Sequence, residues 1–370
     1  MDSLTHIVLG AAVGTAVLGR KAGLRAALVG AVCNTLPDLD VLIPHGSPVR
    51  DLTFHRAETH SLFWLTLAAP VIAWLVAGLN RRVGASYREW LLLVWLSLIT
   101  HPLLDAFTVY GTQLLLPFSD YPVGVGSVFI IDPLVTVPMI VGLLAWLRLR
   151  QTAPDRGMRW NRTGLVASTL YLGWTVAAQA HVESEVQRSI AATPMANHRV
   201  LVTPAPLNSL LWRVVVMDDA SYHEGFRSLF DSNEHIRLEQ HASDPTLLDS
   251  LRDDWTVRRL AWFSRGFYSV RLADARLRTA DGAPGSFSQL LGAVTTARAA
   301  PVASNGAMQP IVMTDLRMGQ TPWFVFSFVV AEHGAQDVTA VPNRQVLSER
   351  PPLTALPWLW RRIWDENATY

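Results

Sequence analysis

The sequence between residues 34 and 60, NTLPDLDVLIPHGSPVRDLTFHRAETH, concentrates ionisable groups in a short connection with apolar sequence on both sides. Side chains of metal-ligating types in this stretch include Asp38, Asp40, His55, Glu58 and His60. Charged and imidazole groups are costly at membrane depth, so a cluster of them beside apolar segments requires a compensating interaction. We interpret the stretch as part of a metal site.

The composition predicts a membrane protein with more than one structural unit. The chain has 370 residues, of which 50% are hydrophobic and 16% are charged, compared with about 25% charged residues in an average soluble domain. A chain of this length exceeds one ordinary globular core. The net charge of +1 gives no support to a nucleic acid partner, and the single cysteine, Cys33, excludes an intrachain disulfide.

Six apolar segments precede residue 181. They cover residues 4–19, 22–36, 61–79, 90–116, 127–147 and 163–180. A membrane-spanning helix needs about 20 apolar residues, and the last four segments meet this length. The first two are shorter and form either a tight hairpin or a re-entrant pair, since the spacing of Gly10 and Gly14 lets helices approach closely. We therefore predict, over residues 1–180, an α-helical integral membrane domain of about six transmembrane helices.

The distribution of basic residues predicts the orientation of these helices. The connections at 20–25, 80–89 and 148–162 together contain eleven Arg and Lys residues, whereas the alternate connections contain only Arg50 and Arg56. Because basic connections face the cytoplasm, we expect the stretch 34–60 and the whole C-terminal part to lie outside. The expected location is the cytoplasmic (inner) membrane of a bacterium, crossed several times.

The composition from about residue 181 onward is that of a soluble domain. We expect an extracytoplasmic α+β domain over residues 181–346, followed by a loose tail over residues 347–370. A helical pattern covers residues 247–263. Runs typical of strands cover residues 210–217, 266–273, 311–318 and 323–332. In the tail, LPWLWRRIW (356–364) is an amphipathic segment that either lies on the membrane or packs on the domain.

The pair formed by His101 and Asp105 is the sharpest local signal for chemistry. Residues four apart share one face of a helix, so this imidazole and carboxylate point toward the same place. Without further evidence, such a pair in an apolar helix is as often a structural pair, whose two side chains hydrogen-bond each other, as part of a metal site. His6 and the aspartates Asp38 and Asp40 are expected at the same outer face, which favours a shared site. Because the two aspartates alternate along the chain, only one of them is expected to point inward.

The run from His55 to His60 provides further candidates. Neutral imidazole and carboxylate groups are ligands for Zn²⁺ and similar ions, and such an ion lowers the pKa of bound water toward about 7. Glu58 is a candidate general base or orienting residue, and Arg56 is a candidate clamp for a phosphate oxygen. The sequence contains no H-E-x-x-H, so a zincin-type peptidase has no support.

The first half of the chain resembles the YdjM-like family of inner-membrane proteins, which are inferred to be metal-dependent hydrolases. The matching pieces are MDSLTHIVLGAAVG, NTLPDLDVL, HRAETHSLF, THPLLDAFTVYGTQLLLPFS and FIIDPL. Together they cover most of residues 1–135. The family is distantly similar to zinc-dependent phospholipases C and single-strand nucleases, which bind two or three zinc ions.

The resemblance implies a ligand set for this chain. The implied metal ligands are His6, Asp40 or Asp38, His60, His101 and Asp105, with His55 a less clear match. The related enzymes use one or two His-x-x-x-Asp pairs. A second pair is absent here, which favours one or two divalent ions, with zinc the expected metal.

These observations predict a membrane-bound, metal-dependent hydrolase at the outer face of the cytoplasmic membrane. Its location favours membrane lipid as a partner and a phosphoester of a lipid or envelope component as the substrate. The alternative is a non-enzymatic membrane protein that binds or transports a metal, or a scaffold for the C-terminal domain. A polar path reaching the basic connections would favour transport. The sequence leaves the oligomeric state open.

Overall fold

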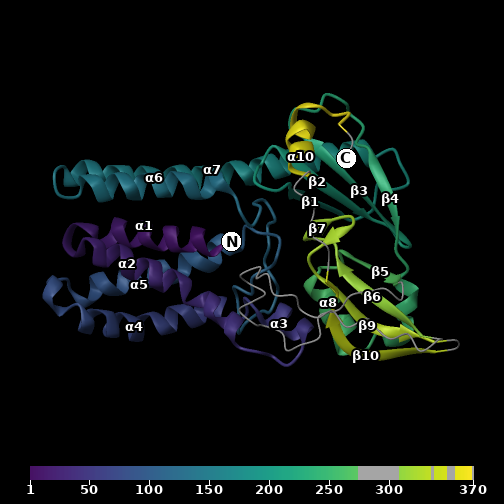
Figure 1. Cartoon of the computed structure of the whole chain (residues 1–370), viewed down its shortest axis with the longest axis horizontal. Helices are drawn as coiled ribbons and strands as arrows, with labels where there is room; N and C mark the ends of the chain where they lie inside the picture. The colour runs from purple at the N-terminus through teal and green to yellow at the C-terminus, as the bar shows by residue number, and fades with distance from the viewer. Residues whose placement is uncertain (274–307, 335–336, 348–354, 369–370) are drawn as a thin grey trace. The chain divides into compact units, whose positions relative to one another are not determined.

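The computed structural model describes residues 1–273, 308–334, 337–347 and 355–368 (Figure 1). The chain divides into two compact units, which we call the helical unit and the C-terminal unit. The helical unit consists of Met1–Asp40, Arg56–Ala178 and Pro204–Ser209. The C-terminal unit consists of Val41–His55, Gln179–Thr203 and the chain from Leu210 onward.

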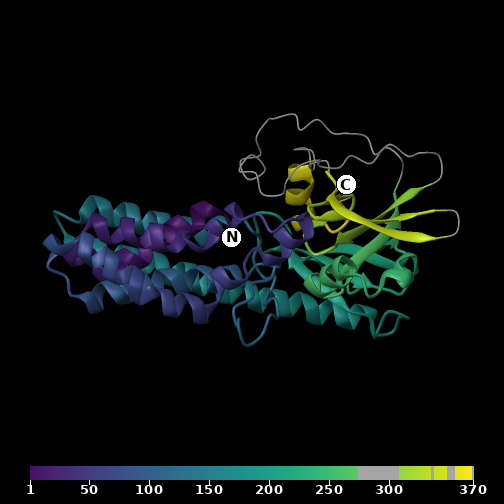
Figure 2. The same cartoon turned by 90° about the horizontal axis from the view of Figure 1, so that it is seen from below.

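The helical unit is built on five helices and the first part of a sixth. These are α1 (Ser3–Ala22), α2 (Leu24–Thr35), α4 (Leu62–Leu79), α5 (Tyr87–Asp105), α6 (Pro133–Leu149) and α7 (Pro154–Ile190). Short 3-10 helices interrupt the connections at η1 (Pro37–Leu42), η2 (Glu58–His60) and η3 (Arg81–Val83). Helix α1 packs on α2, α5 and α6, and α4 packs on α5, as Figures 1 and 2 show.

Helices α1 and α2 approach closely because glycines meet at their crossing. A Cβ atom added to Gly10 would lie 2.3 Å from the carbonyl oxygen of Gly30, and one added to Gly14 would lie 2.2 Å from that of Ala26. The predicted role of the Gly10/Gly14 pair in close helix packing is confirmed. This contact fixes the C-terminal end of α2, where Asn34 lies buried.

Helix α5 places a buried stripe of side chains along one face. Its first turn is fixed by a capping box, in which Ser86 and Glu89 each bond the backbone of the other. Trp90, Leu93 and Leu98 are then buried with at most 1% exposure. The same helical spacing carries this buried face on to His101 and Asp105 at the end of the helix. The last two turns therefore present ionisable groups to a closed interior.

The prediction of about six transmembrane helices is wrong. Within the described part of the chain, α1 and α4 are the two helices long and apolar enough to cross a membrane. Helices α2 and α6 are apolar but have only 12 and 17 residues. Helix α5 ends at Asp105, and the apolar sequence after it contains turns and an isolated bridge between Thr112 and Val123.

The physical reason for this error is that the hydropathy of a segment does not show where its helix ends. Apolar residues that pack against other helices give the same signal as residues that face lipid. The multi-pass topology with an outer C-terminal domain rested on the six predicted spans and is not supported.

In the residues that the structure describes, the C-terminal unit combines helices with two four-stranded sheets. The first sheet has the order β1-β2-β3-β4 and the second β10-β9-β6-β5. Its strands are β1 (Val200–Pro204), β2 (Leu211–Met217), β3 (Ser221–Ser228), β4 (Leu238–Ala242), β5 (Tyr268–Leu272), β6 (Gln309–Asp315), β9 (Ser327–His333) and β10 (Val338–Gln345), with a small hairpin formed by β7 (Gly319–Gln320) and β8 (Trp323–Phe324). Neighbouring strands β2 and β3 pair antiparallel over the full length of β2, with Leu211 opposite Ser228.

Helices cover parts of these sheets. They are α3 (Pro48–Phe54), η4 (Pro245–Leu251), α8 (Trp255–Phe263) and α10 (Ala355–Trp364). Helix α10 contacts β2 and β3, and its side chains Trp358, Leu359 and Ile363 are buried. The sequence left two positions open for this amphipathic segment, on the membrane or on the domain. The face that carries these buried side chains packs on the domain. Residues 348–354 and 369–370 of the predicted tail lie outside the described residues.

Candidate metal centre

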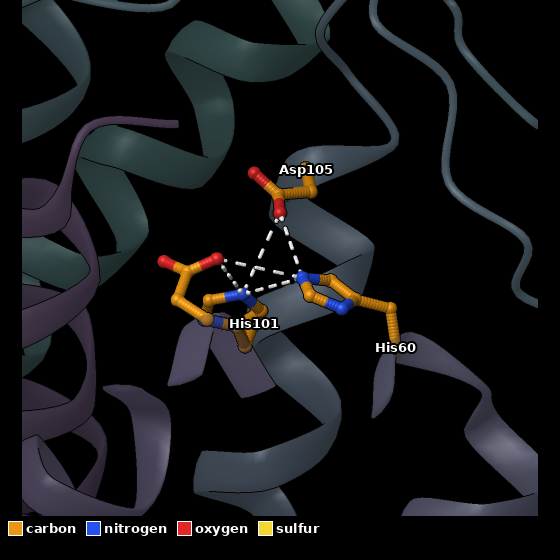
Figure 3. Close-up of side chains that lie close together, drawn as sticks. His60, His101 and Asp105 are labelled. Atoms are coloured by element: carbon orange, nitrogen blue, oxygen red, sulfur yellow. Dashed lines mark hydrogen bonds and ion pairs between the residues drawn. The ribbon is translucent and has the colours of Figure 1, made fainter. Parts of the chain in front are cut away.

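Four side chains of the helical unit bring their ligand atoms together. Asp38 comes from η1, His60 from η2, and His101 and Asp105 from the last turns of α5. One ligand atom from each residue lies within 4.8 Å of all the others. Figure 3 shows the imidazoles of His60 and His101 and the carboxylate of Asp105 directed at one point. We call these four residues the metal cluster.

Five of the six ligand separations within the metal cluster are close to those of a tetrahedral cation site. The two Nε2 atoms of His60 and His101 lie 3.1 Å apart. Asp38 Oδ1 lies 3.4 Å from His101 Nε2 and 3.5 Å from His60 Nε2, and Asp105 Oδ2 lies 3.5 Å from each. A Zn²⁺ ion about 2.0–2.1 Å from four ligands would set them about 3.3–3.4 Å apart. An octahedral site of the same radius would set neighbouring ligands about 2.9 Å apart.

The orientation of His101 leaves one ring nitrogen available to a cation. Its Nδ1 lies 2.5 Å from the backbone carbonyl oxygen of Asn34. A carbonyl only accepts hydrogen bonds, so Nδ1 carries the proton and the neutral ring keeps its lone pair on Nε2. The side chain of Asn34 donates to the carbonyl of Ser97, 2.6 Å away, which ties this acceptor to α5. A hydrogen bond of this kind is the usual way proteins fix a metal-binding imidazole.

His60 is held from behind by a second carboxylate. Asp40 Oδ2 lies 3.6 Å from His60 Nδ1 and accepts hydrogen bonds from the Thr59 hydroxyl at 2.7 Å and from the Arg56 backbone N–H at 3.1 Å. The Thr59 hydroxyl also lies 3.0 Å from His60 Nδ1. The structure therefore places Asp38 at the cluster and Asp40 behind it, an alternative that the sequence left open.

The two oxygens of Asp105 have different surroundings. Oδ1 lies 3.2 Å from Arg56 Nη2 and 3.2 Å from His6 Nε2, and it contacts the amino group of Met1. Oδ2 faces the two imidazoles of the metal cluster and, although buried, accepts no hydrogen bond. A buried acceptor without a donor is rare and calls for an explanation. A cation at the centre of the cluster supplies one.

The remaining predicted residues lie around or apart from the metal cluster. His6 is buried beside it, and its ring stacks on that of His101 with centroids 3.8 Å apart. Arg56 is buried with its guanidinium 4.8 Å from the centre of the Tyr110 ring. His55 ends α3 in the C-terminal unit, and Glu58 is exposed at the start of η2.

Sequence reasoning missed the supporting groups Asn34 and Thr59. Asn34 acts through its backbone carbonyl, which every residue has, so no residue type signals it. Its side chain was the available signal, because a buried amide in an apolar helix needs hydrogen-bond partners.

The charge of the metal cluster favours a cation. Burial raises the pKa of Asp38, but its hydrogen bonds with His101 and His60 outweigh burial and hold the pKa below its ordinary value. Burial lowers the pKa of His60, yet the neighbouring carboxylates of Asp105 and Asp38 leave the pKa above its ordinary value. Both shifts have the cause expected of two carboxylates that draw positive charge toward the same point.

The fold and the metal cluster define a class of protein: a helical unit with apolar helices and a candidate centre for a metal ion. Residues 1–182 match the sequence model of the YdjM inner membrane protein family, and this part of the chain belongs to that family. The chain is also similar to the uncharacterized protein YfhP of Bacillus subtilis (strain 168), at 29% identity over 157 residues. That match covers 40% of this chain and 46% of the relative. No solved structure is a significant match.

Proposed function

We propose that this protein is a hydrolase of the inner membrane that depends on one divalent cation, held by Asp38, His60, His101 and Asp105. The supporting observation is that five of the six ligand separations lie at 3.1–3.5 Å, close to those around a tetrahedral ion. Two imidazoles with two carboxylates are typical zinc ligands, so zinc is the proposed metal.

A zinc ion at this position supplies Lewis acidity, which polarises an ester and favours deprotonation of water. The chain's own groups determine how a substrate approaches. The side chains of His60, His101 and Asp105 are fully buried, whereas that of Asp38 is 26% exposed. The open side of the metal cluster is therefore at Asp38, and we propose that the substrate enters there.

The substrate we propose is a phosphoester of a lipid or of an envelope component. Two observations support this class: the match to an inner membrane protein family and the positive charge of Arg56 beside the metal cluster. Because its guanidinium also lies 3.2 Å from the Thr108 hydroxyl, Arg56 is fixed in place and adds positive charge beside an anionic substrate. Glu58, which is exposed and two residues before His60, remains the proposed general base.

The test combines metal analysis with an activity screen on the full-length protein in detergent. Zinc content is measured by mass spectrometry, and hydrolysis is measured on phospholipids and soluble phosphoesters. We expect about one zinc ion per chain and hydrolysis of a phosphoester, both lost in His101→Ala. The matched control is His181→Ala, which removes a half-exposed imidazole from the distal part of α7.

Each outcome decides between the functions considered. Zinc bound without hydrolysis of any substrate would favour the non-enzymatic metal-binding or transport protein. Zinc content that is unchanged in His101→Ala would overturn the proposed site.

A further inference from the structure

Helix α4 exposes apolar side chains along its whole length. The helix contains no charged residue and buries only Leu65, Ala69 and Ala73. A stripe of large apolar side chains on the opposite side, among them Leu67, Val71 and Trp74, is exposed. At about 1.5 Å per residue, its 18 residues extend about 27 Å, close to the about 30 Å of a bilayer's hydrocarbon core. The exposed stripe of α4 is therefore suited to face lipid.

The metal cluster lies at the end of the hairpin where α4 begins. His60 precedes the first residue of α4 by two positions, and its Nε2 lies 3.1 Å from that of His101 on α5. Helix α4 packs against α5, and the short connection 80–86 joins them, so α5 ends beside the start of α4 (Figure 1). If α4 spans the hydrocarbon, the metal cluster lies close to the level of the lipid headgroups.

Four apolar side chains around this end of α4 are exposed. Phe63 and Trp64 belong to the first turn of α4, and Leu115 and Phe118 belong to the loop that follows α5. Their exposed fractions lie between 37% and 78%, with Phe118 the most exposed. The Phe63 ring meets the rings of Trp64 and Phe118 edge to face, with centroids 5.0 Å and 5.3 Å apart. We call these four residues the apolar rim.

The loop that carries Leu115 and Phe118 is fixed to the start of α4. The backbone N–H of Leu62 donates to the carbonyl oxygen of Leu114 at 3.0 Å, and that of Phe118 donates to the carbonyl oxygen of Leu115 at 2.9 Å. Backbone groups that are paired within the protein can approach hydrocarbon at low cost. The loop therefore holds its apolar side chains outward, and contiguous exposed apolar side chains mark an interaction surface.

We propose that the apolar rim inserts into the interface of a lipid bilayer, and that the metal cluster acts on the headgroup ester of a lipid in that bilayer. Lipid is the favoured occupant because Trp64 continues the exposed stripe of α4, and Trp is enriched where membranes meet water. The match of this unit to an inner membrane protein family supports the same occupant. The substrate rests on the proposed function, whereas the insertion of the rim does not.

The first experiment measures the depth of position 118 in vesicles of phosphatidylethanolamine and phosphatidylglycerol. The full-length protein carries Cys33→Ala, which removes its buried native thiol, and Phe118→Cys is labelled with a fluorophore. Thr152→Cys, at an exposed position in the connection between α6 and α7, is the labelled control. We expect brominated acyl chains to quench the label at position 118, and iodide in the water to quench the label at position 152.

Two results would overturn the insertion of the rim. One is quenching at position 118 by iodide with no effect of brominated lipid. The other is a label at position 118 that neither quencher reaches, because protein then covers the rim, either a second copy of the chain or another segment of the same chain.

The second experiment compares two esters with the same headgroup, a long-chain phospholipid in the vesicles and a short-chain analogue in solution. We expect Phe118→Asp to lower hydrolysis in the vesicles at least about tenfold, since full burial of a Phe side chain in hydrocarbon is equivalent to about that factor or more. Hydrolysis of the soluble analogue and zinc content should stay unchanged. Phe118→Trp should keep the rate in vesicles, and Thr152→Asp is the control for the added charge.

The two parts of the inference fail in different ways. An equal loss on both esters in Phe118→Asp would overturn the assignment of a bilayer lipid as substrate. If the unaltered protein binds no zinc or hydrolyses neither ester, the proposed function fails, and the quenching at position 118 alone then decides whether the apolar rim meets lipid.

Discussion

Buried charges are balanced in different ways in the two units. In the C-terminal unit, the buried carboxylate of Glu224 accepts hydrogen bonds from the Arg213 guanidinium and from the backbone N–H of Thr321, 3.1 Å away. In the helical unit, Asp105 Oδ2 faces the imidazoles of His60 and His101 and accepts no hydrogen bond. Both carboxylates are buried and contact a guanidinium, but both oxygens of Glu224 accept hydrogen bonds from protein donors, whereas Asp105 Oδ2 accepts none.

The difference separates a structural ion pair from a binding site. A buried pair of opposite charges is complete without a ligand, and its cost of desolvation is offset by hydrogen bonds. Two carboxylates and two imidazoles around a buried oxygen that accepts no hydrogen bond are incomplete until a cation is added. The arrangement at Asp105 therefore indicates a cation-binding site, whereas that at Glu224 indicates an ion pair that stabilises the fold.

Replacing Asp105 is expected to have the largest effect, because it removes a ligand and also the partner of a buried guanidinium. We expect Asp105→Asn to reduce zinc content below a tenth and to lower the free energy of unfolding by about 3–5 kcal/mol, since Arg56 is left buried without its counter-charge. Metal analysis and denaturant unfolding measure the two effects. Asp155→Asn, at a side chain that is 70% exposed, is the control. Normal zinc content in Asp105→Asn would remove the contrast between the units.

Replacing Glu224 is expected to cost stability alone. Glu224→Gln should lower the free energy of unfolding of the C-terminal unit by about 3 kcal/mol, because Arg213 loses its buried partner, and should leave zinc content unchanged. Circular dichroism and metal analysis on the same sample give both values. A loss of zinc in this variant would show that the ion pair is not purely structural.

The same residue predicts a pH dependence. Burial raises the pKa of Glu224, but the Arg213 charge and the hydrogen bond from Thr321 outweigh it and hold the pKa below its ordinary value. A lowered folded-state pKa contributes stability that is present above the unfolded-state pKa of about 4.3 and is lost as pH falls toward the folded-state pKa. The melting temperature should therefore fall below about pH 4.3 more steeply in the unaltered protein than in Glu224→Gln. Equal slopes would contradict the assignment.

Added zinc is expected to stabilise one unit only. At a free zinc concentration 100 times the dissociation constant, binding adds about 2.7 kcal/mol to the stability of the state that binds it. Hydrogen exchange should slow in α5 and around His60, with β2 and β3 unaffected. His60→Ala should abolish the effect. Equal protection of α5 and of strands β2 and β3 would favour nonspecific binding.

The smallest expected effect concerns the glycines that bring α2 to its position. A Cβ atom on Gly30 would lie 2.1 Å from the carbonyl oxygen of Gly10, whereas one on Gly78 in α4 meets no atom within 4 Å. We expect Gly30→Ala to destabilise the helical unit by about 1–3 kcal/mol and to weaken zinc binding, because Asn34 moves with α2. Gly78→Ala should stabilise by about 0.4–1 kcal/mol. Thermal unfolding of both variants tests the pair, and equal effects would exclude close packing as the cause.

Much of the candidate site was predictable because its signals are local in sequence. His101 and Asp105 share a helix face through their spacing, and the resemblance added His60. The choice between Asp38 and Asp40 was not predictable, because a 3-10 helix rather than regular alternation sets their directions. The number of spans was predicted wrongly, because the extent of α5 and the length of α2 depend on where turns interrupt apolar sequence.

The sequence by itself determined the ligand types, the helical spacing that places two of them together, and the family of residues 1–182. These are properties of neighbouring residues and of composition. Only the tertiary structure decided that Asp38 meets residues some 20 to 70 positions away, that Asn34 fixes the proton of His101, and that α3 folds with the C-terminal unit. Contacts between residues so far apart in the sequence depend on how helices and loops pack in three dimensions, and no local sequence pattern predicts them.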